Sequence, residues 1–473
     1  MCHRVFWRPM TQILLTLVVL AEIAGLFYLD RDTRVRPSPA LWIPVVWMLI
    51  VGSREISEWM SLRNRTTVAS KFTEGNLSDA LGFAFLMVLG FLVLNFRPRQ
   101  VAGVLQRNLP LFLFLFYCLF SVLWSDFPVV AIKRWVKAIG TLMMVLIILT
   151  DPHPRVAIRQ FFSRISFLLL PLSVLFIEGF PDLGSTYDPV ERVTYYVGVM
   201  TQKNELGVVS LICGLGSLGS FLGALGIRNR HERMRKLIAH GILIATAFWL
   251  LKKSDSMTSL SSLVIAGAVM VLIYRRSTQF RATYVHAVVG TALVLAVFAT
   301  FLDESGALLR LVGRTATLTG RTEIWKAVLS FHTNQLFGTG YDSFWLGSRI
   351  NKVWEIIGYK GIAEAHNGYL EIYINLGWMG LALLTGVVLN GYRDAIHMHR
   401  TDPLGASLRL ALITAALMYS LTEAGFRMMT PMWIALLMQV TWAPRGLELQ
   451  KPQPHPALRR AQVDGRRPRQ IIL

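Results

Sequence analysis

Residues 204–226 read NELGVVSLICGLGSLGSFLGALG, and no side chain from Leu206 to Gly226 is charged. A helix of about 20 apolar residues is long enough to cross the hydrocarbon core of a bilayer. Comparable runs predict candidate spans near residues 10–29, 39–52, 78–95, 109–125, 132–150, 161–180, 204–226, 237–252, 257–274, 284–302, 370–391, 407–423 and 430–443. We therefore predict an all-α, polytopic membrane protein with about 12 transmembrane helices.

The composition supports this class and argues against a soluble protein. Hydrophobic residues make up 53% of the 473 residues and charged residues only 16%, whereas soluble domains carry about a quarter charged residues. The net charge of +20 would suggest nucleic-acid binding in a soluble chain. Here the basic residues gather in short loops and the C-terminal tail, where membrane topology places them. We therefore predict no nucleic-acid partner.

The basic loops predict which face of the membrane each segment occupies. Arginine and lysine gather at 97–107, 228–236, 275–281, 393–400 and 459–469. Cytoplasmic loops carry an excess of these residues. The outward segments are then predicted to be 181–203, 253–256, 303–369 and 424–429. Because arginines flank the first apolar run on both sides, the orientation of the first two spans stays open.

This topology divides the chain into five parts. They are N-terminal spans at 1–77, a transmembrane bundle at 78–302, a large periplasmic loop at 303–369, C-terminal spans at 370–443 and a basic cytoplasmic tail at 444–473. The tail is rich in proline and arginine, a composition that predicts disorder. The long loop is predicted to contain short helices, because Trp325, Val328 and Leu329 recur at helical spacing after Gly320. Glycines 338 and 340 predict a tight turn after them.

Several cations on the outward side could bind an anion. Arg321 opens the predicted loop helix, and Arg192 and Lys203 lie in the 181–203 segment. The arginine side chain is a planar fork of donors that matches phosphate oxygens, and a helix N-terminus favours anions. The simpler alternative is solvated surface charge, or, for Arg192, a local ion pair with Asp188 or Glu191. Glu423 and Arg427, on the last outward segment, could pair with each other or line a site.

His366 ends the long loop where the chain enters a span. Histidine can release and regain a proton near neutral pH, so His366 could accept a proton from a sugar hydroxyl. The alternative is a helix-capping His366–Asn367 pair. Gly377 and Gly380 follow and predict close approach of a neighbouring helix. No P-loop, metal-ligand spacing or Ser-His-Asp arrangement is found in the sequence, so neither a cofactor nor a metal is predicted.

Three elements together resemble the O-antigen ligase and polymerase superfamily. His366-Asn367, nine residues, Gly377, two residues and Gly380 match its H-[NSQ]-x9-G-x-x-[GTY] pattern. Gly320-Arg321 with Trp325 is similar to its Gly-Arg-x-x-x-Trp element, and Lys203-Asn204 to its Lys-Asn element. Trp124-Ser125, Pro128 and Lys133-Arg134 resemble the exopolysaccharide-polymerase branch. The resemblance covers roughly residues 80–440.

The resemblance implies a metal-independent, nucleotide-free glycosyltransferase in the bacterial inner membrane. Its donor would be a glycan on undecaprenyl pyrophosphate, used at the outer face of that membrane. The implied catalytic residues are His366, Arg321 and Arg192, and the implied donor-binding residues are Lys203, Asn204 and Asn367. Besides the donor and membrane lipids, a chain-length regulator and a flippase are the candidate partners.

Three functions stay open at this point. The first is a polymerase of exopolysaccharide or O-antigen repeat units, and the second is a ligase that moves finished glycan onto a lipid or protein. The third is a non-enzymatic transporter. Transporters often show internal repeats and helices broken near the middle of the membrane. Neither feature is evident in the sequence, which favours the two enzymes.

Overall fold

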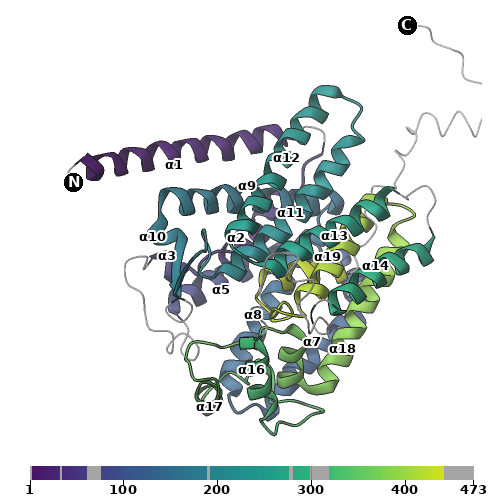
Figure 1. The fold of residues 1–473 in the computed structure, drawn as a ribbon. Helices are drawn as coiled ribbons and strands as arrows, with labels where there is room; N and C mark the ends of the chain where they lie inside the picture. Colours follow the sequence, from purple (N-terminus) through teal and green to yellow (C-terminus); the bar gives the residue numbers. More distant parts are fainter. Residues whose placement is uncertain are drawn as a thin grey trace, which may run out of the picture.

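The computed structural model describes residues 3–31, 35–60, 76–188, 192–275, 281–298, 300 and 319–441. Residues 303–318 of the predicted periplasmic loop and the predicted tail, 444–473, lie outside these ranges. Within them almost all regular structure is helical, with one two-stranded antiparallel hairpin (Figure 1). The prediction of an all-α fold is confirmed.

The elements follow one another along the chain without a second sheet in the described ranges. They are α1 (His3–Leu29), η1 (Pro39–Leu41), α2 (Trp42–Val51), α3 (Ile56–Met60), α5 (Leu77–Asn95), α6 (Pro98–Arg107), α7 (Leu109–Phe120), η2 (Ser121–Trp124), α8 (Pro128–Leu149), α9 (Pro154–Gly179), α10 (Pro181–Gly184), β1 (Ser185–Asp188), β2 (Val193–Tyr196), α11 (Lys203–Leu225), α12 (Arg230–Lys253), α13 (Met257–Arg275), α14 (Ala282–Val297), α16 (Thr319–Leu329), α17 (Ser348–Ile357), α18 (Gly368–Met398), α19 (Pro403–Tyr419) and α20 (Pro431–Val440).

Seven helices in the described ranges are long and apolar enough to cross a membrane. They are α1 from Met10 onward, α5, α9, α11, α12, α13 and α18. The pair formed by α6 and the α7–η2 segment is bent by 85° and makes an eighth if it is one span. Four shorter apolar segments are Pro39–Val51, α14, α19 and α20. The multi-pass membrane class is confirmed, while the count of about 12 stays a prediction.

Segments predicted to share a face of the membrane lie together in the structure. At one end of the bundle, Thr258 at the start of α13 and Thr422 after α19 bond through their hydroxyls at 2.8 Å. At the other end, Arg155 at the start of α9 pairs with Asp402, which caps α19, at 3.3 Å. The loop helices α16 and α17 and the start of α14 lie on opposite sides of the molecule (Figure 1). This separation agrees with the two faces that the basic loops predict.

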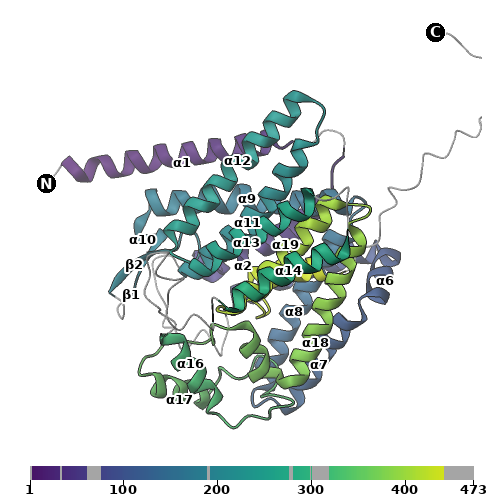
Figure 2. The ribbon, with the colours of Figure 1, turned by 45° about the vertical axis from the view of Figure 1, so that its right-hand side comes forward.

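Helix α1 runs along α9 in the opposite direction, and both ribbon views show the two side by side (Figures 1 and 2). Gln12 donates to the carbonyl of Gly179 at 2.9 Å near one end, and the Phe27 ring meets Phe167 edge-on at 5.1 Å near the other. Gly179 leads directly into the predicted outward segment. Helix α1 therefore begins at the end of the bundle that carries that segment, which gives the first span the orientation that the arginines left open.

Helix α18 is broken at Gly377, which has a φ of 64° and a ψ of −165°. The break frees the backbone N–H groups of Trp378 and Met379, which donate to the carbonyls of Gln335 and Leu336 at 2.9 and 3.1 Å. A Cβ on Gly377 would lie 2.2 Å from the Leu336 oxygen. The prediction that Gly377 admits a neighbouring helix is therefore wrong. It admits a loop instead, since freed backbone groups at this depth need protein partners.

We expect Gly377→Ala to destabilise the protein, because alanine is strained at positive φ and its Cβ would meet backbone atoms that cannot rotate away. The strain alone is worth about 1–3 kcal/mol. Gly386→Ala on the same helix is the matched control, because nothing lies within 4 Å of the Cβ it would add. Thermal unfolding in detergent should show a lower Tm for Gly377→Ala only. Equal Tm values for both variants would contradict this account.

Candidate functional site

A buried carboxylate, Glu423, gathers side chains from three distant parts of the chain. Its Oε1 accepts a hydrogen bond from Arg321 Nη2 at 2.5 Å. Its Oε2 accepts one from Asn204 Nδ2 at 3.1 Å and lies 3.3 Å from His366 Nδ1. The structure thus joins three of the six predicted site residues through one side chain, which we call the Glu423 cluster.

The loop helix α16 places Arg321 beside His366. Its inner face, including Ile324 and Val328, is buried against Phe344 in a small second core. Trp325, one turn after Arg321, donates from Nε1 to the carbonyl of Ala365 at 2.7 Å. That bond fixes the start of α16 against the residue that precedes His366. The prediction of a helix here is confirmed, and the helix begins at Thr319.

The backbone of His366 adopts a φ of 47°, which is uncommon for a residue with a side chain. Buried Glu371 holds this turn, because it accepts hydrogen bonds from the Ala365 N–H at 2.5 Å and from Trp345 Nε1 at 3.0 Å. Strained backbone of this kind persists only where the surroundings impose it, and it gathers at functional sites. The turn directs His366 toward Glu423 instead of into helix α18.

Two carboxylates set the charge state of His366. Burial alone would lower the pKa of this imidazole, but the Glu364 and Glu423 carboxylates outweigh burial. Arg321 opposes them, and the net result is a pKa raised above the ordinary histidine value. A base must be unprotonated to accept a proton, so a reaction that uses His366 should speed up as the pH rises through this pKa.

Asn204 and Asn367 have structural partners as well. Asn204 follows Lys203 in the first turn of α11, whose capping box pairs Gln202 with Glu205. Asn367 caps α18 by accepting from the Leu370 N–H at 3.0 Å, and it donates to the carbonyl of Leu421 at 3.0 Å. The capping alternative therefore holds for Asn367, while donor binding by either asparagine stays a prediction.

Arg192 and Lys203 are not brought into the Glu423 cluster. Arg192 is exposed at the turn of the β1–β2 hairpin, with a φ of 53°. Lys203 stacks its ammonium on the Tyr195 ring at 3.4 Å. The alternative ion pair between Arg192 and Glu191 lies outside the described residues. Binding by Arg192 would require the hairpin and a long substrate to meet.

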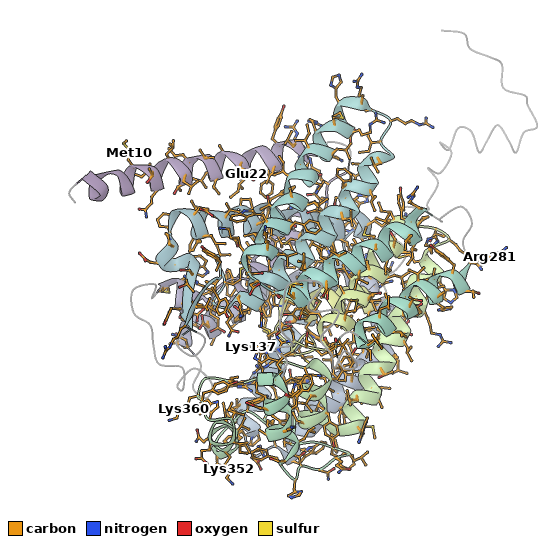
Figure 3. The ribbon with its side chains drawn as sticks, viewed as in Figure 1. Met10, Glu22, Lys137, Arg281, Lys352 and Lys360 are labelled. Carbon is orange, nitrogen blue, oxygen red and sulfur yellow. The ribbon has the colours of Figure 1, made fainter. Side chains whose placement is uncertain are left out.

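A cavity of about 430 Å³ adjoins the cluster and is lined in part by Asn204, Glu364 and Glu423. It also receives two cations to which the sequence assigned no role, Arg134 and Lys137 of α8. Lys137 lies at the centre of the molecule in Figure 3. Its ammonium is 5.1 Å from the Phe83 ring centre. A cavity that joins cations to a histidine is suited to an anionic substrate with a reacting hydroxyl.

Arg427 also lines this cavity, and it does not pair with Glu423 as one sequence alternative had it. Its Nε lies 3.7 Å from Asp342, whose other carboxylate oxygen is 3.1 Å from Arg134. Its Nη1 donates to the carbonyl of Ala363 at 3.1 Å. Asp342 therefore holds two cations from different elements at the cavity wall. Their sequence separation gave no signal of this grouping.

Glu364, His366 and Glu423 place one ligand-type atom each within 4.8 Å of one another, a geometry that could hold a metal ion. Sequence spacing missed this group because Glu423 comes from a remote segment. Glu423 already carries the guanidinium of Arg321 at 2.5 Å, and that positive charge would repel a metal cation at the same carboxylate. We therefore interpret the group as an ion-pair and hydrogen-bond network.

Two comparisons with known proteins bear on this site. Residues 240–385, which include Arg321 and His366, match the family model described as O-antigen ligase. The "Exopolysaccharide production protein ExoQ" of Rhizobium meliloti (strain 1021) is 24% identical over 314 residues, covering 62% of this chain. The match spans 66% of that relative, slightly under two thirds of its length. The matches and the motifs together place this chain in the O-antigen ligase and polymerase superfamily.

Proposed function

We propose that the chain is a membrane glycosyltransferase that joins lipid-pyrophosphate-linked oligosaccharide repeat units into exopolysaccharide or O-antigen. It would work at the outer face of the bacterial inner membrane. The observation that carries the proposal is the Glu423 cluster, in which Arg321 and His366 meet beside a cavity lined by further cations. The name of the Rhizobium relative supports exopolysaccharide as the product class.

The proposed reaction needs one base and stabilisation of one leaving group. The hydroxyl oxygen of the acceptor sugar attacks the anomeric carbon of the donor and forms the new glycosidic bond. The bond from that carbon to the pyrophosphate oxygen breaks, and the electron pair leaves with the lipid pyrophosphate. The hydroxyl proton passes to His366. Positioned cations stabilise the charge that develops on the leaving oxygen.

The cations around the cavity differ in how far their charge is already neutralised. Arg321 faces Glu423, and Arg134 and Arg427 share Asp342. In the described part of the chain no carboxylate pairs with Lys137, which stacks on Phe83. Arg321 uses Nη2 toward Glu423 and keeps further N–H donors for a phosphate. Lys137 and Arg321 are therefore the cations that we propose contact the pyrophosphate.

A ligase is the second candidate, because the matching family model is described as O-antigen ligase. The two enzymes would share donor chemistry and differ in the acceptor. Transport has one feature in its favour, since α18 is broken at Gly377, which the sequence did not reveal. Backbone of the 335–340 loop fills that break, whereas a transporter opens such breaks toward its substrate. We therefore favour the enzymes.

The proposal is tested with purified protein in detergent, a lipid-pyrophosphate-linked oligosaccharide, no nucleotide and an excess of chelator. We expect products that grow by whole repeat units, because the donor already carries its activating pyrophosphate. The products are measured by mass spectrometry. Strict dependence on a divalent metal would contradict the metal-free mechanism. Transfer to an added glycolipid acceptor without any chain growth would favour the ligase.

A further inference from the structure

We infer that Glu423 is the positioning residue of His366: it accepts the Nδ1 proton, so that Nε2 is left to take the proton of the acceptor hydroxyl. The inference rests on the proposed function, because it assigns a role within the same reaction. It names a residue that the family motifs do not contain. The inference stands on the geometry of four side chains that come from four separate segments.

The position of the Glu423 carboxylate is fixed from both of its oxygens. Arg321 binds Oε1 at 2.5 Å, and Asn204 binds Oε2 at 3.1 Å. The side chain is only 3% exposed. A buried carboxylate held at both oxygens has little freedom to rotate. It is therefore a rigid reference against which the His366 ring can be oriented.

Glu364 is the competing partner of His366, and the two carboxylates differ in quality of contact. Glu364 Oε1 lies 3.1 Å from Nδ1 as an ion pair, and its side chain is 28% exposed. Glu423 Oε2 lies 3.3 Å from the same nitrogen in a hydrogen bond. Glu364 is also an immediate neighbour in sequence, on a turn that moves with His366. Glu423 is the partner that can orient the ring relative to the rest of the site.

The two ring nitrogens of neutral histidine have different roles, one as donor and one as acceptor. A carboxylate at Nδ1 favours the form in which Nδ1 carries the proton. Nε2 then carries the free electron pair that a general base needs. When Nε2 gains the acceptor proton, the ring becomes positively charged, and Glu423 stabilises that charge. Both effects require the carboxylate itself.

The charged groups that face His366 come from its own turn and from two other elements. Glu364 lies on the turn, Glu423 on the segment after α19, and Arg321 on α16. The carboxylates raise the histidine pKa and Arg321 lowers it. Loss of the Glu423 charge also leaves Arg321 without its partner. Both changes act in the same direction, toward a lower pKa.

The first measurement does not depend on catalysis. Diethyl pyrocarbonate modifies unprotonated histidine, and peptide mass spectrometry follows the labelling of His366 alone across pH. We expect the labelling midpoint of Glu423→Gln to fall by about one pH unit, since an opposite charge at this range shifts a pKa by about 1–3 units. An unchanged midpoint would overturn the inference. A fall in this midpoint would hold even if the wild-type protein proved to have no polymerase activity, in which case only the proposed function fails.

The second measurement is the rate of chain extension at a pH above both midpoints, where the ring is neutral in either protein. There we expect Glu423→Gln to lower kcat by up to about 100-fold, within the range that a general base contributes, with little change in KM. Glu364→Gln should also lower the midpoint but cost less kcat. If Glu364→Gln lowered kcat as much as Glu423→Gln, the positioning role would be wrong.

Two further variants complete the design. Glu323→Gln makes the same substitution on an exposed residue of α16 and should leave both measurements at the wild-type values. Glu423→Asp keeps the charge but shortens the reach to Nδ1. It should therefore keep the midpoint raised while lowering kcat, and it decides the question if Glu423→Gln does not fold. Wild-type kcat in Glu423→Asp at every pH would overturn the inference.

Discussion

His366→Ala lowers the rate of chain extension by about 100- to 10,000-fold, which is the usual contribution of a general base. The reason is that the acceptor hydroxyl loses the only neutral-pH base that the structure places on the Glu423 cluster among the described residues. The donor cations remain in place, so binding of the lipid-linked donor should be retained. The measurement is kcat with a purified oligosaccharide donor, with KM determined in the same series.

The matched control is His332→Ala, which removes an exposed histidine of the same loop. It should keep wild-type kcat, since His332 lies outside the cluster. Thermal unfolding of both variants separates lost chemistry from lost structure. A folded His366→Ala protein with full activity would rule out the mechanism and leave the cluster with a structural role.

Arg321→Ala should reduce kcat by about 100- to 1,000-fold, the range found when a positioned donor to a developing oxyanion is removed. The guanidinium has a second function, because it is the charge partner of the buried Glu423 carboxylate. An unpaired buried charge destabilises a protein, so Arg321→Ala should also lower the Tm. Arg321→Lys separates the two effects: it keeps the charge beside Glu423 but loses the planar fork that fits phosphate.

We therefore expect Arg321→Lys to regain most of the Tm and only part of the activity. Lys326→Ala, at an exposed position on the same helix, is the control and should change neither. The variants are compared by thermal unfolding and by steady-state kinetics with the lipid-linked donor. An Arg321→Lys protein with full kcat would show that charge alone is needed at this position.

The structure corrects the sequence analysis where backbone contacts decide. The spacing of Gly377 from His366 is visible in the sequence, and small residues there suggested close helix packing. Only the fold shows that α18 breaks at Gly377 and that loop carbonyls take the freed N–H groups. The interior of the predicted loop, which carried no readable motif, forms α17 and a small core around Phe344.

The sequence by itself determined the membrane class, because long apolar runs have few stable arrangements in a bilayer other than helices. It also picked out His366 and Arg321, since a proton acceptor and a phosphate-binding fork are properties of single residues. Only the tertiary structure decided which side chains act together. Glu423 lies 57 residues from His366, 102 from Arg321 and 219 from Asn204. No local pattern encodes such separations, because they are set by how the helices α11, α16, α18 and α19 pack.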